Sequence, residues 1–117
     1  MNGLRIFGKG KVNIGNNFHS GRGVKIYTQS HNHKGDKIPY DRSTKLYEIN
    51  IGDNVWLGDD VKIVGNIDIG EGAIVQVGSV VSSDIPPLEI VGGNPAKAFM
   101  HRDPEHYYAK KKAGRFH

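Results

Sequence analysis

Aliphatic side chains recur along residues 49–85 at alternating steps of two and four positions. A step of two keeps both side chains on one face of a β-strand, and the following step of four leaves a three-residue corner before the chain points inward again. An amphipathic helix would instead show mixed steps of three and four. The pattern predicts a strand and a corner every six residues, with Ser79 as the one polar member of the inward series Ile49, Ile51, Val55, Leu57, Val61, Ile63, Ile67, Ile69, Ala73, Val75, Ser79, Val81 and Ile85.

The residues between these strands suit tight corners. They tolerate positive φ or hydrogen-bond their own backbone, as in Gly52-Asp53-Asn54, Gly58-Asp59-Asp60, Gly65-Asn66 and Gly70-Glu71-Gly72. Three six-residue units bring the chain round, so each strand pairs in parallel with its copy one coil later, at about 4.8 Å. The sequence therefore predicts an all-β fold, a three-sided solenoid.

The same register extends through the N-terminal 30 residues with lower fidelity. Because the first residue already falls inside the repeat, we expect the lower end of the prism to be closed by another chain or by part of a longer protein. A coil domain is expected over residues 1–95. Its N-terminal inward positions are Ile6, Gly8, Val12, Ile14, Phe18, Ser20, Val24, Ile26 and Ser30.

The repeat is interrupted over about residues 32–44, where glycine, proline and charged residues replace the spaced aliphatic ones. The segment from Ile26 to Asn50 has 25 residues, seven more than the 18 of one coil. We therefore expect seven residues to leave the prism as a loop. Loops on a rigid scaffold are where function concentrates.

After Ile85, two prolines and a short apolar run predict a last partial coil, followed by a tight turn. Asp103-Pro104-Glu105 then supplies an N-cap, a proline at the first helical position and an acid in the first turn. Gly114 suits the end of the helix. Residues 96–117 are thus expected to form a turn and a basic tail with a short helix from about 104 to 113.

Composition and charge exclude several classes of function. The absence of cysteine excludes a disulfide framework, a thiolate nucleophile and a zinc–thiolate site. The net charge of +4 lies in residues 96–117, which fits a small polyanionic ligand or a solvated end rather than the broad basic face of a nucleic-acid binder. No signal-peptide pattern or long apolar run is present, so we expect a cytoplasmic protein without a membrane span.

His31 is the leading candidate for chemistry. In the repeat register Ser30 points inward, so His31 points outward where the loop departs. Counting coils without the insertion predicts one outward column of Asn13, His31, Trp56 and Ile74. An exposed indole one strand spacing from an imidazole would form an apolar slot beside a titratable base. A neutral imidazole can take the proton of an attacking hydroxyl, worth about 10²- to 10⁴-fold in rate.

Four motifs follow one another in a characteristic order: IYTQSHNH, INIGDNVWLG after the loop, GSVVSSDIPP and IVGGNPAK. Together with the six-residue repeat, this order resembles the sugar O-acetyltransferase branch of the hexapeptide-repeat acyltransferases, which includes galactoside and maltose acetyltransferases. The resemblance implies a left-handed parallel β-helix, a departure from the usual right-handed crossover. It also implies an acetyltransferase that uses acetyl-coenzyme A as its cosubstrate.

The resemblance further implies roles for individual residues. His31 would be the general base that activates a carbohydrate hydroxyl for direct attack on the thioester, without an acyl-enzyme. The cleft of this family lies between neighbouring prisms, so we expect a homotrimer with three sites and no metal. The coenzyme would be bordered by Trp56, Asp59, Val77, Ser82, Ser83 and Lys97, and the acceptor by His33, Tyr40 and Trp56.

Two departures from the family pattern leave questions open. Ser82-Ser83 stand where relatives often carry Thr-Lys, so Lys97 and the basic tail would have to hold the coenzyme phosphates. An N-terminal region that contributes acceptor contacts in relatives is absent here. The acceptor, and the choice between O-acetylation and the N-acetylation of an amino sugar or a xenobiotic, therefore stay open.

Two other classes of function are compatible with the sequence. His31 and His33 alternate along one strand and could hold a metal ion, as in a β-helix enzyme resembling the γ-carbonic anhydrases, but His19 and His101 are not obviously placed to complete such a site. The third class is a non-catalytic coil array that serves as an assembly module. Tyr40, Asp41 and Arg42 in the loop are either acceptor contacts or ordinary turn residues.

Overall fold

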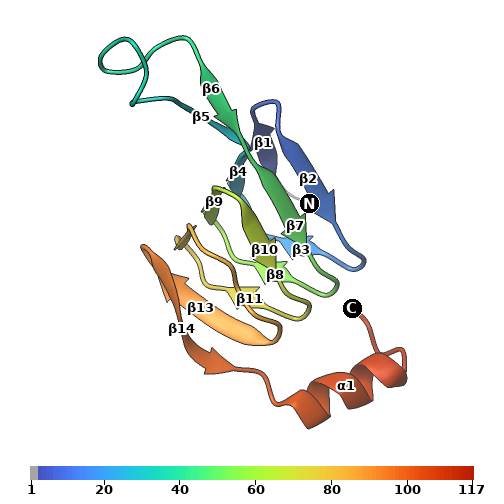
Figure 1. The fold of residues 1–117 in the computed structure, drawn as a ribbon. Helices are drawn as coiled ribbons and strands as arrows, with labels where there is room; N and C mark the ends of the chain where they lie inside the picture. The colour runs from blue at the N-terminus through green and yellow to red at the C-terminus, as the bar shows by residue number, and fades with distance from the viewer. Residues whose placement is uncertain (1–2) are drawn as a thin grey trace.

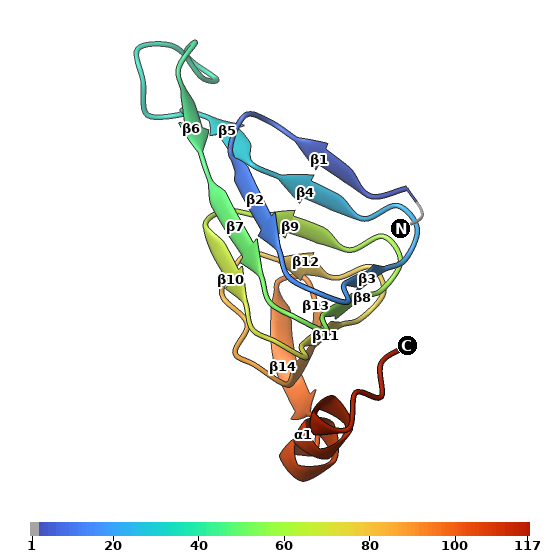
Figure 2. The same ribbon diagram turned by 90° about the vertical axis from the view of Figure 1, so that its right-hand side faces the viewer.

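The computed structural model describes residues 3–117, which form three stacked sheets, a protruding two-stranded ribbon and one helix (Figures 1 and 2). We name the stacked sheets after one strand each. The β4 sheet contains β1 (Arg5–Phe7), β4 (Lys25–Tyr27), β9 (Lys62–Val64) and β12 (Val80–Val81). The β7 sheet contains β2 (Lys11–Ile14), β7 (Glu48–Ile51) and β10 (Ile67–Ile69). The β8 sheet contains β3 (His19–Ser20), β8 (Trp56–Leu57), β11 (Ile74–Val75), β13 (Glu89–Gly93) and β14 (Ala96–His101).

The register of these sheets shows a regular parallel coil. Ile49 pairs with Ile67, Ile63 with Val81 and Leu57 with Val75, and each pair is 18 residues apart. The chain visits the β7, β8 and β4 sheets in turn and then returns to the first one. The solenoid architecture predicted from the six-residue repeat is therefore present, and only β14 runs antiparallel to its neighbour.

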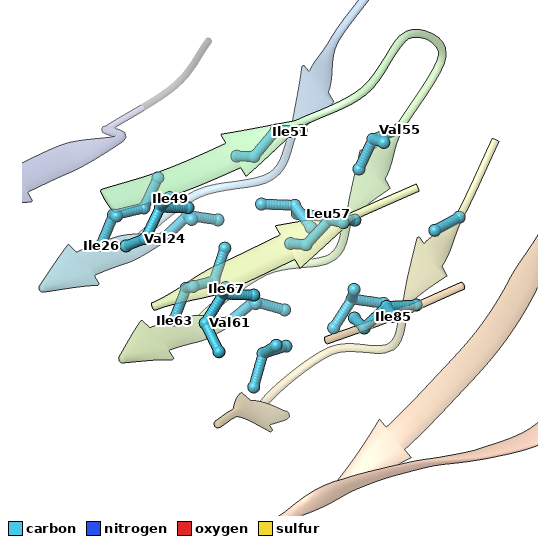
Figure 3. Close-up of a cluster of buried hydrophobic side chains, with 14 of the residues drawn as sticks. Val24, Ile26, Ile49, Ile51, Val55, Leu57, Val61, Ile63, Ile67 and Ile85 are labelled. Carbon is cyan, nitrogen blue, oxygen red and sulfur yellow. The ribbon is translucent and has the colours of Figure 1, made fainter. Parts of the chain in front are cut away.

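The inward positions form one continuous core (Figure 3). All thirteen positions predicted between Ile49 and Ile85 are buried. Ser79, the polar member of that series, is only 1% exposed, and its hydroxyl oxygen accepts the backbone N–H of Gly93 at 3.1 Å. The polar break in the repeat therefore fixes the turn between β13 and β14.

The corners adopt the left-handed conformation at their third residue. At the corner between the β7 and β8 sheets, Asn17, Asn54, Gly72 and Leu88 all have φ between 53° and 72°. Three of these four residues are of types that enter this region readily, and Leu88 is the exception. The side chains of Asn17 and Asn54 also bond to each other across coils, at 2.9 Å.

The N-terminal coil follows the same register but is poorly covered. Ile6 pairs with Ile26, and Ile14 pairs with Ile51, as inward residues should. Ile6 is nevertheless 49% exposed, because within the described residues no coil lies beyond β1, β2 and β3. The apolar seam is thus open at this end.

The ribbon that leaves the prism is longer than the seven-residue loop expected from the sequence. Ile26 pairs with Ile63, 37 residues later, which exceeds a regular coil by 19. The extra chain contains the antiparallel strands β5 (Gln29–His31) and β6 (Thr44–Leu46) and the loop between them. The ribbon projects away from the prism at the end opposite the helix (Figure 1).

The C-terminal helix α1 (Pro104–Lys112) confirms the predicted helix of residues 104–113. The carboxylate of its N-cap, Asp103, accepts the N–H of Glu105 at 3.0 Å. Burial raises the pKa of the Tyr107 phenol, whose oxygen accepts a hydrogen bond from Asn54 and donates one to Glu71. Lys111 also bonds Glu71, at 2.6 Å, which raises the pKa of that lysine.

A glycine makes this docking possible. Gly72 has a φ of +72°, and a Cβ at that position would lie within 2.7 Å of the Tyr107 ring and within 2.6 Å of the Leu88 side chain. Since both neighbours are packed, a larger residue would push the helix off the corner. The helix therefore lies against the corner between the β7 and β8 sheets.

A matched pair of substitutions tests how burial varies along the coil. Ile63→Ala should lower the free energy of unfolding by about 2–5 kcal/mol, since a fully buried isoleucine leaves a cavity. Ile6→Ala, in the same inward column, should cost far less because its side chain is half exposed. Urea unfolding at equal protein concentration measures both. Equal losses would show that the N-terminal end is closed in solution.

Candidate functional site

His31 lies at the end of β5, at the root of the protruding ribbon. It pairs with Thr44 of β6 and is exposed, so the predicted outward orientation agrees with the structure. The Tyr40 ring stacks on its imidazole, with 3.9 Å between ring centroids and 14° between planes. One face of the imidazole is thereby covered, while the ring stays open to a substrate.

A hydrogen-bond network holds the loop that carries Tyr40. The Asp41 carboxylate accepts the Ser43 N–H at 2.8 Å, the Ser43 hydroxyl at 2.5 Å and the Asp36 N–H at 3.2 Å. The Asn32 side chain donates to Ser43 Oγ at 3.2 Å, and the Asn32 carbonyl accepts the Asp41 N–H at 3.3 Å. The loop is therefore tied to the residue that follows His31.

These bonds also set the ionisation of Asp41. The Ser43 side chain, and then the Ser43 backbone N–H, hold the pKa of this carboxyl below its usual range. The sequence analysis listed Asp41 as an acceptor contact or a turn residue, and in the structure it supports the turn. The Asp41-x-Ser43 spacing, typical of an Asx turn, was the available signal.

The root of the ribbon is anchored in the prism. Thr28 is buried, its hydroxyl donates to the Phe7 carbonyl at 2.8 Å, and its own carbonyl accepts the Tyr47 N–H at 2.8 Å. Ser30 Oγ and the Tyr47 hydroxyl are 2.5 Å apart. His31 therefore follows a fixed segment by only one residue.

Trp56 lies elsewhere in the chain, and the predicted outward column is wrong in part. Trp56 is 55% exposed and pairs with Ile74, as expected, but its other neighbour is His19. Asn13 pairs with Asn50 of the β7 sheet, and His31 leaves the prism altogether. The error came from assigning seven residues to an excursion of 19, which shifted the count by two strands.

The residues predicted to border the coenzyme fall at three places. Asp59 and Val77 share the corner between the β8 and β4 sheets, where the Asp59 carbonyl accepts the Gly78 N–H at 2.8 Å. Ser82 and Ser83 are exposed just after β12, and Lys97 is exposed in β14 opposite Gly92. Within one chain, none of these lies on the ribbon with His31.

The remaining predicted acceptor residues stay near the base. His33 is exposed in the loop, two residues after His31, and Tyr40 covers the imidazole as described above. Residues that sequence reasoning overlooked are Asn32, Ser43 and Tyr47, which hold the ribbon in place. Between residues 3 and 117, no group of three or more metal-ligating side chains is gathered. Over the same range, α1 is too short and polar to cross a membrane.

Comparison with known proteins identifies the repeat. Residues 48–83 match the family model described as bacterial transferase hexapeptide (six repeats). These coils are bacterial transferase hexapeptide repeats. The matched segment includes Trp56, Asp59 and Val77 and ends at Ser83.

Relatives extend the likeness beyond the repeats. A Schizosaccharomyces pombe protein named "Putative acetyltransferase" is 38% identical over 92 residues, covering 74% of this chain and 41% of its own length. A Vibrio cholerae hexapeptide-repeat acetyltransferase, solved with acetyl-coenzyme A, is 34% identical with a TM-score of 0.69, covering 79% of this chain and 50% of that one.

A galactoside acetyltransferase in complex with coenzyme A is 26% identical with a TM-score of 0.78, and the match covers 89% of this chain and 52% of that one. The chain therefore spans about half the length of these structures, and less than half of the curated relatives just named.

The Asp41 network predicts a pH response of the ribbon. A carboxyl whose pKa is lowered on folding contributes stability that is present above its ordinary pKa and lost as the pH falls through the lowered value. The Ser43 amide resonance should therefore shift with acid titration below the ordinary carboxyl range. NMR of the Asp41→Asn variant supplies the control, in which that titration should vanish. A Ser43 amide that titrates identically in both proteins would contradict the network.

Proposed function

We propose that the protein transfers the acetyl group of acetyl-coenzyme A to a hydroxyl group of a sugar or glycan precursor. The observation that carries the proposal is the exposed imidazole of His31, held against Tyr40 at the root of a ribbon on a hexapeptide-repeat prism. The resemblance to the sugar O-acetyltransferases adds the left hand of the coil and a division into a coil domain, residues 1–95, and a tail, residues 96–117.

His31 acts as the general base. Its neutral ring nitrogen takes the proton of the acceptor hydroxyl as the oxygen attacks the thioester carbonyl. The tetrahedral intermediate then collapses, the carbon–sulfur bond breaks, and the imidazolium returns its proton to the departing thiolate. No acyl-enzyme forms, which accords with the absence of cysteine from the chain.

Tyr40 and the ribbon shape the acceptor side. The stacked phenol leaves the other face of the imidazole open, and His33 lies two residues along the same loop. Trp56, with more than half of its surface exposed, is the apolar wall that the reacting groups require. The choice between a hydroxyl and an amino acceptor depends on groups that contact the acceptor itself.

A homotrimer completes the site in this proposal. His31 leaves the prism with the ribbon, whereas Trp56, Asp59 and Val77 lie on the β8 sheet and its corner. One chain therefore presents the two halves at different places, and a cleft that unites them needs the ribbon of one subunit over the prism of the next. Ser82, Ser83 and Lys97 would border the coenzyme from the C-terminal coils.

His31→Ala should reduce turnover by about 10²- to 10⁴-fold, because the general base is lost. The side chain is exposed, so the thermal unfolding temperature and oligomeric state should stay unchanged. Release of coenzyme A thiol, followed with a chromogenic disulfide and a panel of sugars, measures the rate. Near-normal turnover in the variant would exclude His31 as the base, and chelator-sensitive turnover would indicate metal chemistry instead.

Lys97→Ala should raise the KM for acetyl-coenzyme A by about tenfold, the effect of losing one charged hydrogen bond to a phosphate, and leave the acceptor KM unchanged. The lysine is exposed on β14 and pairs through its backbone with Gly92, so its removal should not disturb the strand. Lys112→Ala, on the solvent side of α1, serves as the matched control. Equal increases in both KM values would remove the phosphate role of Lys97.

A further inference from the structure

An open groove of about 660 Å³ lies at the N-terminal end of the coil, at the edge of the β4 sheet. It is lined by Arg5, Arg22, Lys25, Gly3 and Gly23. Every side chain that lines it beyond the glycines is therefore cationic. Both glycines have positive φ, and neither presents a side chain to the groove.

The register of the β4 sheet brings these charges together. Arg5 pairs with Lys25, and Lys25 pairs with Lys62, so three cations stand in one outward column at the strand spacing of about 4.8 Å. Like charges directly opposite each other on neighbouring strands are destabilising. A cost of this kind is retained most readily where an anionic ligand offsets it.

The protein does not neutralise these cations itself. In the part of the chain that the structure describes, the one ion pair within 4.0 Å joins Lys111 to Glu71, far from this sheet edge. The nearest carboxylates belong to the next coil. Asp59 is engaged by the backbone N–H of Arg22 at 2.8 Å, and Asp60 lies behind Gly23.

The same face continues from this groove toward His31. Phe7 and Tyr27 follow Arg5 and Lys25 by two residues, which places them on the same outward side. Their rings stack at 5.2 Å and form an apolar platform beside the cations. β4 then runs into β5, so Lys25 and His31 are six residues apart and at most about 20 Å from each other.

We propose that Arg5, Arg22 and Lys25 bind the phosphoryl group of the acceptor, and that the acceptor is accordingly a phosphate-bearing sugar. The proposal rests on the transferase function given above. Guanidinium groups match phosphate oxygens in bidentate geometry, and a lysine adds a mobile point charge. The Phe7–Tyr27 platform takes the body of the acceptor, while its hydroxyl is directed toward the imidazole.

The cationic pocket beside α1 does not provide this site. That cavity, of about 290 Å³, includes His106 and Arg115, but its Lys111 is already paired with Glu71 and its Arg102 donates to the Gly72 carbonyl at 2.6 Å. It lies against the corner that holds α1, whereas the ribbon leaves the prism at the other end of the molecule (Figure 1).

Binding is tested first, without reference to turnover. Calorimetric titration of the intact protein with glucose, glucose 1-phosphate and UDP-glucose compares a neutral sugar with a monophosphate and a diphosphate ester. We expect at least one phosphorylated compound to bind about tenfold more tightly than glucose, and this advantage to disappear in Arg5→Ala and Lys25→Ala. Lys11→Ala is the control, because Lys11 lies in the same coil on the β7 sheet.

Turnover then separates the acceptor from the coenzyme. In Arg5→Ala and Lys25→Ala, the KM for the phosphorylated acceptor should rise about tenfold or more, while the KM for acetyl-coenzyme A stays constant. A rise confined to the coenzyme would overturn the inference, as would equal binding of glucose and its phosphates. If no acceptor is acetylated, the transferase proposal fails, and the titrations still decide whether the groove binds phosphate.

Discussion

Stacking of inward aliphatic side chains is the interaction on which the rest of the structure depends. Each buried residue lies directly over its counterpart in the next coil, as Ile26 does over Ile63 and Ile63 over Val81. Because the core uses only the inward positions, outward positions and corners are relieved of packing duty. Chemistry in this molecule is accordingly found on the outer faces and on the ribbon.

The ribbon is held in a different way from the prism. Its contacts with the scaffold are hydrogen bonds, at Thr28, Ser30 and Tyr47, and its loop is tied by Asp41 and Ser43. Few apolar side chains are buried there, and large ones such as Ile38 and Leu46 stay exposed. Segments of this kind open at lower free energy than a core strand. A base mounted on such a segment can adjust to its substrate while the prism remains rigid.

The period of six residues was sufficient to predict the inward residues, the left-handed corners and the C-terminal helix. It failed on the length of the excursion, because the ribbon strands alternate with the same period of two as the prism strands. Ser30 and His31 therefore resembled a continuing coil although they belong to β5. The like-charged column was hidden for a related reason: Arg5, Lys25 and Lys62 are 20 and 37 residues apart, not 18.

The two ends of the excursion meet, since the Thr28 carbonyl accepts the Tyr47 N–H at 2.8 Å. An insertion that starts and finishes at adjacent points does not alter the stacking of the coils before and after it, whatever its length, because loop closure becomes costlier only slowly as chain is added. The prism can therefore keep its register while this segment is lengthened, shortened or exchanged in evolution. Diversification of such a scaffold needs no redesign of its core.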